Sequence, residues 1–436
     1  MRTMERLTRS EERGAVATIV ALLLGMGVIL GFAALSIDVG QVMWERRQVQ
    51  NGADGAAFAL AQVCADDLAK CSTTVATTRD SITRINDRNN YQDQAGGFDP
   101  TYYPPSTPGA LPGVCYHAGA FSLPTPSCGS PNGTLGDCAP VPTSLDPLLP
   151  YVEVHSRTRQ SADNSSLLPR WISQTIMGQP TSGTNVAACS RAAWGTPGSY
   201  SGDVPITMST CEWQDATNSG ASWVAEGPTG AWPGYGGAGQ PSMPARYTWP
   251  NTPGQEVIIY LHGNTVDNNC PNSNGRDTGG GFGYLDPASG TCSSLVTTGN
   301  WAQIDTGNSA TNTCQTALGN LHGTVIKVPV FNCLFRDNTA PTWDPKTDTT
   351  HSCLANTGGG NTYYHIEGWA LFYLSGYKIG GGPADERASV VNGVVPCSGN
   401  LRCISGWFLK GTLEATSITY TPGGPSYGTS AVVPAG

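Results

Sequence analysis

The longest uninterrupted apolar run in the sequence covers residues 15–37. No side chain in this run carries a charge, and its polar side chains are the small hydroxyls of Thr18 and Ser36. As a helix with a rise of ~1.5 Å per residue, the run is roughly 34 Å long, enough to cross a hydrocarbon layer of about 30 Å. A helix packed on a soluble core would show a polar stripe, and this run shows none. The pattern therefore predicts a transmembrane helix.

The arginines around this run predict its direction. Four arginines precede the run, at positions 2, 6, 9 and 13. The nearest two after it are at positions 46 and 47. Because basic residues collect on the cytoplasmic side of a span, residues 1–14 should form a cytoplasmic tail, and the rest of the chain should lie outside the cell. The expected topology is a single pass, and the lipid bilayer is the first expected partner.

Two alternatives would remove this anchor. A cleaved secretory signal peptide has an apolar core of about 7–15 residues, which is shorter than the run observed here. A prepilin-type cleavage after Gly14 would go with a glutamate five residues into the mature chain, where the sequence has Ile19. We therefore expect the span to be retained.

Beyond the span, apolar residues recur at steps of three, four or seven over residues 38–70. They are Val39, Val42, Val49, Ala53, Ala57, Leu60 and Cys64. This spacing places them on one face of a helix that continues the span. Within the span, Gly27 and Gly31 have the small-residue spacing that lets two helices approach closely, so they are candidates for helix association.

The rest of the chain predicts short strands separated by turns. Residues 71–150 form a Pro/Gly/Cys-rich insert. Residues 72–90 are compatible with a continued helix, and residues 96–150, dense in Pro, Gly and Ser, predict either a segment ordered by disulfides or a flexible insert. Alternation over residues 151–157 predicts a half-buried strand, and apolar runs predict further strands over 184–194, 204–211, 256–263 and 324–331. Residues 363–379 predict one long strand or two paired ones, and short helices are expected over 167–177 and 313–323.

Composition fits a protein stabilised by disulfides in an oxidising space. There are 14 cysteines, and none stands in a C-x-x-C pair, so the spacing suggests neither a zinc knuckle nor a redox motif. Charged residues make up 13% of the chain, about half of the globular norm. The net charge of −9 argues against a nucleic-acid partner. The disulfide candidates are Cys397 with Cys403, six residues apart, and Cys189 with Cys211, on neighbouring predicted strands.

One segment carries a recognisable motif. After the arginine-flanked apolar run come Asp38-x-Gly40 and then Glu45-Arg46-Arg47-x-Val49-Gln50-Asn51-x-Ala53-Asp54-x-Ala56-Ala57. This order resembles the amino-terminal domain of TadE/TadG-like proteins, pilin-like components of bacterial tight-adherence (Tad, or Flp) pilus assembly. Family members often have alanine where this chain has Gly52 and Gly55. The motif residues carried over are Asp38, Arg46, Arg47, Gln50, Asn51 and Asp54.

The resemblance implies an α+β fold. A transmembrane helix would extend into a pilin-like helix on a small antiparallel sheet, followed by a disulfide-rich, mostly β extracellular domain. The expected segments are a tail (1–14), a span (15–37), a helical extension (38–70), an insert (71–150), pilin-like strands with a short helix (151–211) and the outer β domain (212–436).

Candidate catalytic signals are weak. The apolar strand ending at His262 is similar to the oxyanion strand of α/β-hydrolases, but we expect neither a G-x-S-x-G elbow after it nor the required β-α alternation. His365 and Glu367, two apart on one strand face, form at most a partial metal site. The glycine-rich run at 279–283 lacks the Lys-Ser/Thr of a phosphate loop. We expect no catalytic residue, cofactor or metal.

The sequence therefore predicts a non-catalytic, membrane-anchored accessory component of Tad/Flp pilus assembly, with other pilus subunits as partners. An adhesin that binds surface glycans or cell wall through its 11 tryptophans is the main alternative. A secreted hydrolase is the weaker one.

Overall fold

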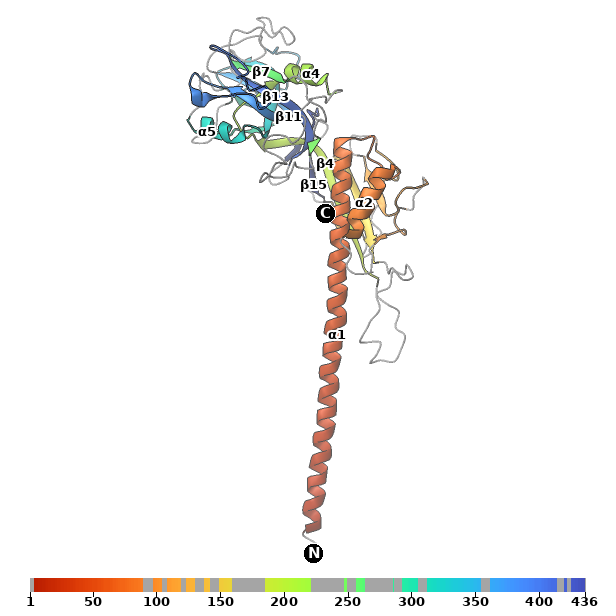
Figure 1. Ribbon diagram of the computed structural model, residues 1–436. Coiled ribbons are helices and arrows are strands. Elements are labelled where there is room, and N and C mark those ends of the chain that lie inside the picture. Colours follow the sequence, from red (N-terminus) through yellow and green to blue (C-terminus); the bar gives the residue numbers. More distant parts are fainter. Residues whose placement is uncertain are drawn as a thin grey trace.

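The computed structural model describes residues 4–88, 97–103, 108–118, 123–129, 137–141, 149–158, 185–220, 247–248, 256–262, 285, 292–304, 312–353, 361–413, 419–421 and 425–435. A long helix, α1, extends away from the rest of the molecule (Figure 1). A helix and several strands pack around its carboxyl-terminal end. A larger, mostly β unit follows beyond them. The predicted combination of helices, mostly β structure and several disulfides is confirmed, but one continuous sheet takes the place of the expected small sheet and separate β domain.

Helix α1 covers Met4–Asp66 without interruption, so the apolar run and its predicted extension form one element. In the first half of the helix, large apolar side chains are exposed, from 49% for Val20 to 68% for Ile29. Among the described residues, we find no helix that combines the length and apolarity required to cross a membrane. The transmembrane segment predicted over residues 15–37 therefore stays a prediction.

Helix α2 (Ala76–Arg88) folds back against the end of α1. The Cys64–Cys71 disulfide joins the last part of α1 to the turn between the helices. Asp67 shapes this turn, because its Oδ1 accepts from the backbone amide of Ala69 at 2.9 Å. Gly52 permits the close approach of the two helices, because a Cβ at this position would lie 2.7 Å from the Asn86 Oδ1 and 2.9 Å from its carbonyl oxygen.

A sheet covers the buried face of α1. It contains β1 (Gly97–Phe98), β2 (Val114–His117), β3 (Tyr151–Arg157), β4 (Ala187–Ser201) and, from late in the chain, β15 (Thr429–Pro434). Neighbours in this group are antiparallel. The core between helices and sheet includes Ala56, Leu60, Ile82, Val152, Val154, Trp194 and Val432. Small residues on α1 allow this close helix–sheet packing, as the spacing of its apolar face predicts.

The sheet continues into the outer unit in the order β1-β3-β4-β15-β13-β11-β10-β5. The main outer strands are β10 (Val325–Arg336), β11 (Thr362–Lys378) and β13 (Arg402–Leu413). Shorter strands are β5 (Met208–Ser209), β6 (Tyr247–Thr248), β7 (Val257–His262), β8 (Leu295–Thr297), β9 (Trp301–Gln303), β12 (Glu386–Arg387) and β14 (Thr419–Thr421). Helices α4 (Thr210–Thr217) and α5 (Asn312–Leu321) and the short 3-10 helix η2 (Pro383–Asp385) complete the unit.

Several predicted strands are present, but one is wrong. Residues 363–379 form one strand, β11, and not a hairpin. Residues 204–211 contain only the two-residue strand β5, because helix α4 starts at Thr210. Its capping box explains the change: the Ser209 hydroxyl accepts from the Glu212 amide, and the Glu212 carboxylate accepts from the Ser209 amide. The predicted helix at 167–177 and the glycine-rich run at 279–283 lie outside the described residues.

Disulfides are distributed over both units. The structure contains the expected Cys397–Cys403 pair. The proposed Cys189–Cys211 bridge is wrong, because Cys189 is joined to Cys138. The other described pairs are Cys64–Cys71, Cys115–Cys128, Cys292–Cys314 and Cys333–Cys353. Cys211 lies in helix α4 and is also disulfide-bonded.

Candidate functional site

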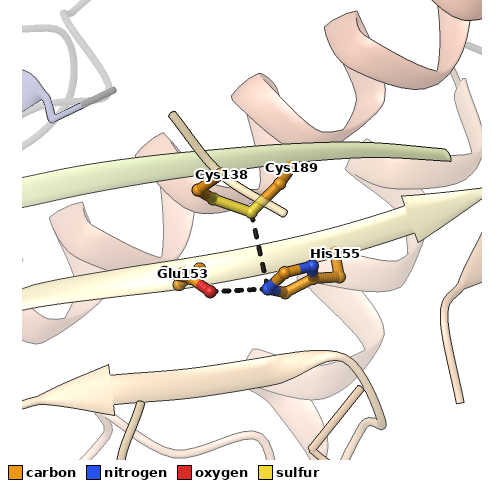
Figure 2. A group of neighbouring side chains, drawn as sticks. All are labelled: Cys138, Glu153, His155 and Cys189. Atoms are coloured by element: carbon orange, nitrogen blue, oxygen red, sulfur yellow. Dashed lines mark hydrogen bonds and ion pairs between the residues drawn. A yellow bond between two sulfur atoms is a disulfide. The ribbon is translucent and has the colours of Figure 1, made fainter. Parts of the chain in front are cut away.

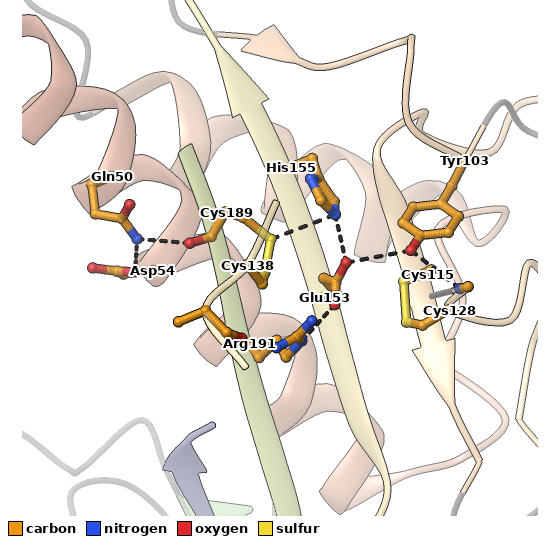
Figure 3. The surroundings of a disulfide bond; sticks show 12 residues. Gln50, Asp54, Tyr103, Cys115, Cys128, Cys138, Glu153, His155, Cys189 and Arg191 are labelled. Atoms are coloured by element: carbon orange, nitrogen blue, oxygen red, sulfur yellow. Dashed lines mark hydrogen bonds and ion pairs between the residues drawn. A yellow bond between two sulfur atoms is a disulfide. The ribbon is translucent and has the colours of Figure 1, made fainter. Parts of the chain in front are cut away.

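The motif segment of α1 meets the sheet at Gln50 (Figure 3). The Gln50 amide nitrogen donates to the backbone carbonyl of Cys189 on β4 at 2.9 Å and to the Asp54 carboxylate one helical turn away at 2.8 Å. Both donors of this amide group are therefore used, one within the helix and one across to the strand.

The other motif residues lie on the outer side of the helix. Arg46, Arg47, Asn51 and Asp54 are exposed, and Asp38 is half-buried. Gly27 and Gly31 lie further toward the amino terminus on α1, and no atom comes within 4 Å of a Cβ placed on Gly31. Gln50 thus connects the motif to the sheet, Ala56 and Ala57 of the same segment pack in the core, and the exposed polar residues form an outer surface.

Directly behind the Gln50 contact, strand β3 carries buried polar side chains. The alternation over residues 151–157 predicts one exposed face, but the structure buries both. Glu153 is 3% exposed and His155 is 2% exposed. The Tyr102 ring stacks on the His155 imidazole at a centroid distance of 4.0 Å, and the Cys138–Cys189 and Cys115–Cys128 disulfides lie beside the two side chains (Figure 3).

The Glu153 carboxylate is held at both oxygens. Its Oε2 accepts from the Arg191 Nε at 2.5 Å, and its Oε1 lies 2.6 Å from the His155 Nε2. The Tyr103 hydroxyl donates to the same Oε1 at 3.4 Å. The Arg191 guanidinium also donates to the backbone carbonyl of Ala139, next to Cys138. Such a carboxylate, with each oxygen occupied by a protein donor, is a structural anchor as it stands.

These contacts shift the pKa values of Glu153 and Tyr103. Burial raises the pKa of Glu153, but the hydrogen bond from His155 and the charge of Arg191 outweigh this effect, so the pKa lies below its ordinary value. Burial, followed by the negative charge of Glu153, raises the pKa of the Tyr103 hydroxyl. Glu153 is therefore ionised at neutral pH and paired with Arg191.

Four potential metal ligands meet at this place: Cys138, Glu153, His155 and Cys189 (Figure 2). Their donor atoms all lie within 4.8 Å of one another. In the structure the two sulfurs are bonded to each other, which leaves the imidazole and the carboxylate as ligands. The expectation of no metal rested on sequence spacing. Glu153 and His155 have the same two-residue spacing as His365 and Glu367, but Cys138 and Cys189 are 51 residues apart in the chain, so spacing alone does not bring the four residues together.

His365 and Glu367, which the sequence offers as a partial metal site, are each bound to other residues of the outer unit. His365 lies on β11, where its Nδ1 is 2.8 Å from the Asn332 Oδ1, and burial lowers its pKa. The Glu367 carboxylate pairs with Lys346 at 2.9 Å and accepts from the hydroxyls of Thr210 and Tyr427. His365 and Glu367 therefore have separate partners.

A G-x-S-x-G pentapeptide does occur, at residues 424–428, contrary to expectation. Its serine, Ser426, leads into strand β15 and does not stand on a strand-to-helix turn, which is the position that a nucleophile elbow requires. His262 is the last residue of β7.

Comparison with known families supports the motif. The family model described as "Putative Flp pilus-assembly TadE/G-like" (Tad) matches residues 14–62, which all lie on α1. The resemblance seen in the sequence is thereby confirmed for this segment. No curated protein and no solved structure gives a significant match to the chain.

Proposed function

We propose that this chain is a membrane-anchored, non-catalytic accessory component of Tad/Flp pilus assembly, with a role like that of a minor pilin. The observation that carries the proposal is the family match over residues 14–62, the length of helix that ends on the sheet. The match of this segment to the Tad model supports involvement in Tad/Flp pilus assembly. The specific role is the proposal.

Anchoring is proposed from the sequence and from the surface of α1. Val16, Ile19, Leu22, Val28, Ile29, Phe32 and Leu35 are each more than half exposed on a stretch of helix with no charged residue. Exposed apolar surface of this extent is costly in water and favourable in lipid. The arginine bias gives a cytoplasmic amino terminus.

Partner binding is proposed for the outer side of the motif. Arg46, Arg47 and Asn51 are exposed where α1 leaves the predicted bilayer, so another single-span pilus subunit could contact them alongside its own span. The function would then depend on helix surfaces and the outer unit, with no chemical step.

The test is made in the native bacterium. Deletion of the gene should lower the number of surface pili counted by electron microscopy, and the wild-type gene should restore it. Arg47→Glu should reduce co-purification with other pilus subunits, whereas Arg84→Glu, a charge reversal on an exposed arginine of α2, should not. Unchanged piliation after deletion would contradict the proposal.

A second test addresses the anchor. The wild-type chain should remain with membranes after alkaline extraction, and replacement of Val28 and Ile29 by aspartate should release it. Recovery of the wild-type chain in the soluble fraction would contradict anchoring.

The adhesin alternative gains less support. The outer unit carries an aromatic cluster on its surface. Its members are the half-buried Trp301, Phe335 and Trp343 and the exposed His351. However, the Trp343 ring stacks on the His351 imidazole at 5.0 Å, and its backbone carbonyl accepts from the Trp301 indole at 2.8 Å. Rings that cover one another in this way offer less flat surface to a sugar.

A further inference from the structure

The Cys138–Cys189 disulfide has unusual neighbours for a buried cross-link. One of its sulfurs, the Cys189 Sγ, lies 3.5 Å from the His155 Nε2, which in turn lies 2.6 Å from the Glu153 Oε1 (Figure 2). A disulfide needs no polar partner, and burying an imidazole and a carboxylate beside it carries a desolvation cost. Once the sulfurs are separated, the same four side chains offer two thiolates, an imidazole and a carboxylate, each of which is a known type of zinc ligand.

The distances suit such a site. In tetrahedral coordination with Zn–S bonds of about 2.3 Å and Zn–N bonds of about 2.0–2.1 Å, neighbouring ligand atoms lie roughly 3–4 Å apart. The four donor atoms already lie within 4.8 Å of one another, and the backbone positions of the two cysteines are 4.8 Å apart. Rotation of the two cysteine side chains is the main change required after the bond opens.

Charge also balances. Two thiolates and one carboxylate carry three negative charges, and a zinc ion supplies two positive ones. The guanidinium of Arg191, 5% exposed and bonded to the outer carboxylate oxygen of Glu153, supplies the third. A partner that orients a ligating carboxylate in this way is typical of the groups that support metal ligands.

We propose that reduction of the Cys138–Cys189 disulfide by a dithiol turns this cluster into a zinc site formed by Cys138, Cys189, His155 and Glu153. The dithiol gives two electrons and two protons to the disulfide, yielding two cysteine thiols and its own disulfide. Zn²⁺ then displaces the two thiol protons to solvent and binds the thiolates, the His155 Nε2 and the Glu153 Oε1.

The consequence is a replaceable cross-link. Cys138 belongs to the described segment 137–141, and Cys189 lies near the start of β4, on the strand that receives Gln50. With the disulfide intact, a covalent bond joins the two segments. After reduction, zinc would hold them together. The zinc site does not depend on a role of the chain in pilus assembly.

The test uses the full chain in detergent. The protein is reduced with dithiothreitol, freed of reductant under anaerobic conditions and titrated with Co²⁺ and then Zn²⁺. We expect reduced wild type to bind one more ion per chain than the equally treated Cys138→Ser/Cys189→Ser variant. The wild-type Co²⁺ complex should show thiolate charge-transfer bands and a tetrahedral spectrum, a readout that needs no variant.

Matched variants separate this site from the other thiols that reduction exposes. His155→Gln and Glu153→Gln should weaken Co²⁺ binding at least about tenfold. The Cys397→Ser/Cys403→Ser variant loses a disulfide that has no cluster of metal ligands around it in the described part of the chain, and it should keep the extra ion. Equal metal binding by wild type and Cys138→Ser/Cys189→Ser, or an unchanged Co²⁺ spectrum in His155→Gln, would overturn the proposal.

Discussion

Gln50 on helix α1 donates a 2.9 Å hydrogen bond to the backbone carbonyl of Cys189, a residue 139 positions later in the chain. Cys189 forms the disulfide with Cys138, and its Sγ lies 3.5 Å from the Nε2 of the buried His155. One side chain of the family motif is thereby connected to the polar interior of the sheet. This contact gives the motif a structural role in addition to its exposed surface.

Replacing Gln50 by alanine should lower the free energy of unfolding by about 1 kcal/mol, because it removes the bond to β4 and leaves a half-buried carbonyl without this donor. Thermal unfolding of the full chain in detergent measures the change. Gln48→Ala is the matched control, since the half-buried Gln48 side chain stands one half-turn away on the same helix. Equal shifts in the two variants would argue against a special role for Gln50.

Gly52 should tolerate no larger residue. In Gly52→Ala the new methyl group would meet both the side chain and the backbone carbonyl of Asn86, so α1 and α2 must separate and the melting temperature should fall. Gly40→Ala on the same helix meets no atom within 4 Å and should stabilise the helix by up to about 1 kcal/mol through helix propensity. A gain in both variants would show that the helices do not pack as closely as described.

Removal of the buried charge in Glu153→Gln should cost about 3–5 kcal/mol, because it leaves the Arg191 guanidinium buried without its partner. Asp67→Asn breaks an exposed pair with Lys70, whose side chains are 38% and 63% exposed, and should cost less than about 1 kcal/mol. Urea unfolding of both variants gives the comparison. A small loss in Glu153→Gln would mean that water reaches this part of the sheet.

Glu45 should make stability depend on pH. Burial raises the pKa of its carboxyl above the ordinary 4.5, and its Oε1 finds no hydrogen-bond partner in the described parts of the chain. The folded state therefore holds this proton more tightly than the unfolded chain, so the stability contributed by Glu45 falls as pH rises above about 4.5. Glu45→Gln should remove this fall.

The measurement is the melting temperature of wild type and Glu45→Gln between pH 4 and 8. The difference should grow in favour of the variant as pH rises. Glu153 acts in the opposite direction, since its lowered pKa makes its contribution appear as pH rises, and it is present equally in both proteins. Parallel curves would show that the Glu45 carboxyl is hydrated.

The helix was predictable because its information is local. An apolar run followed by apolar residues at helical spacing indicates one continuous element, and α1 is continuous over Met4–Asp66. Helix α4 was also locally encoded, since Ser209 and Glu212 have the spacing of a capping box. The apolar and β-branched residues before it favoured a strand over residues 204–211. That prediction wrongly placed Cys211 on a strand, whereas it lies in helix α4.

The polar interior was not predictable in the same way. Alternation on β3 correctly separates Val152 and Val154 from Glu153 and His155, but it does not say what covers the second face. The cover comes from Tyr102, Tyr103 and Cys138, which lie in segments without periodic pattern. Cysteine pairing has the same difficulty, because it depends on which distant segments meet.

The position of β15 affects the order in which the protein can be completed. Residues 429–434 lie between β4 and β13, and Ala431 to Pro434 pair with Gly195 to Ala192 of β4. Synthesis runs from the amino end, so this edge of β4 stays open to foreign strands while more than two hundred later residues are made. A product that terminates before residue 429 would thus be a candidate for aggregation or for capture by a chaperone, even with every motif residue of α1 in place.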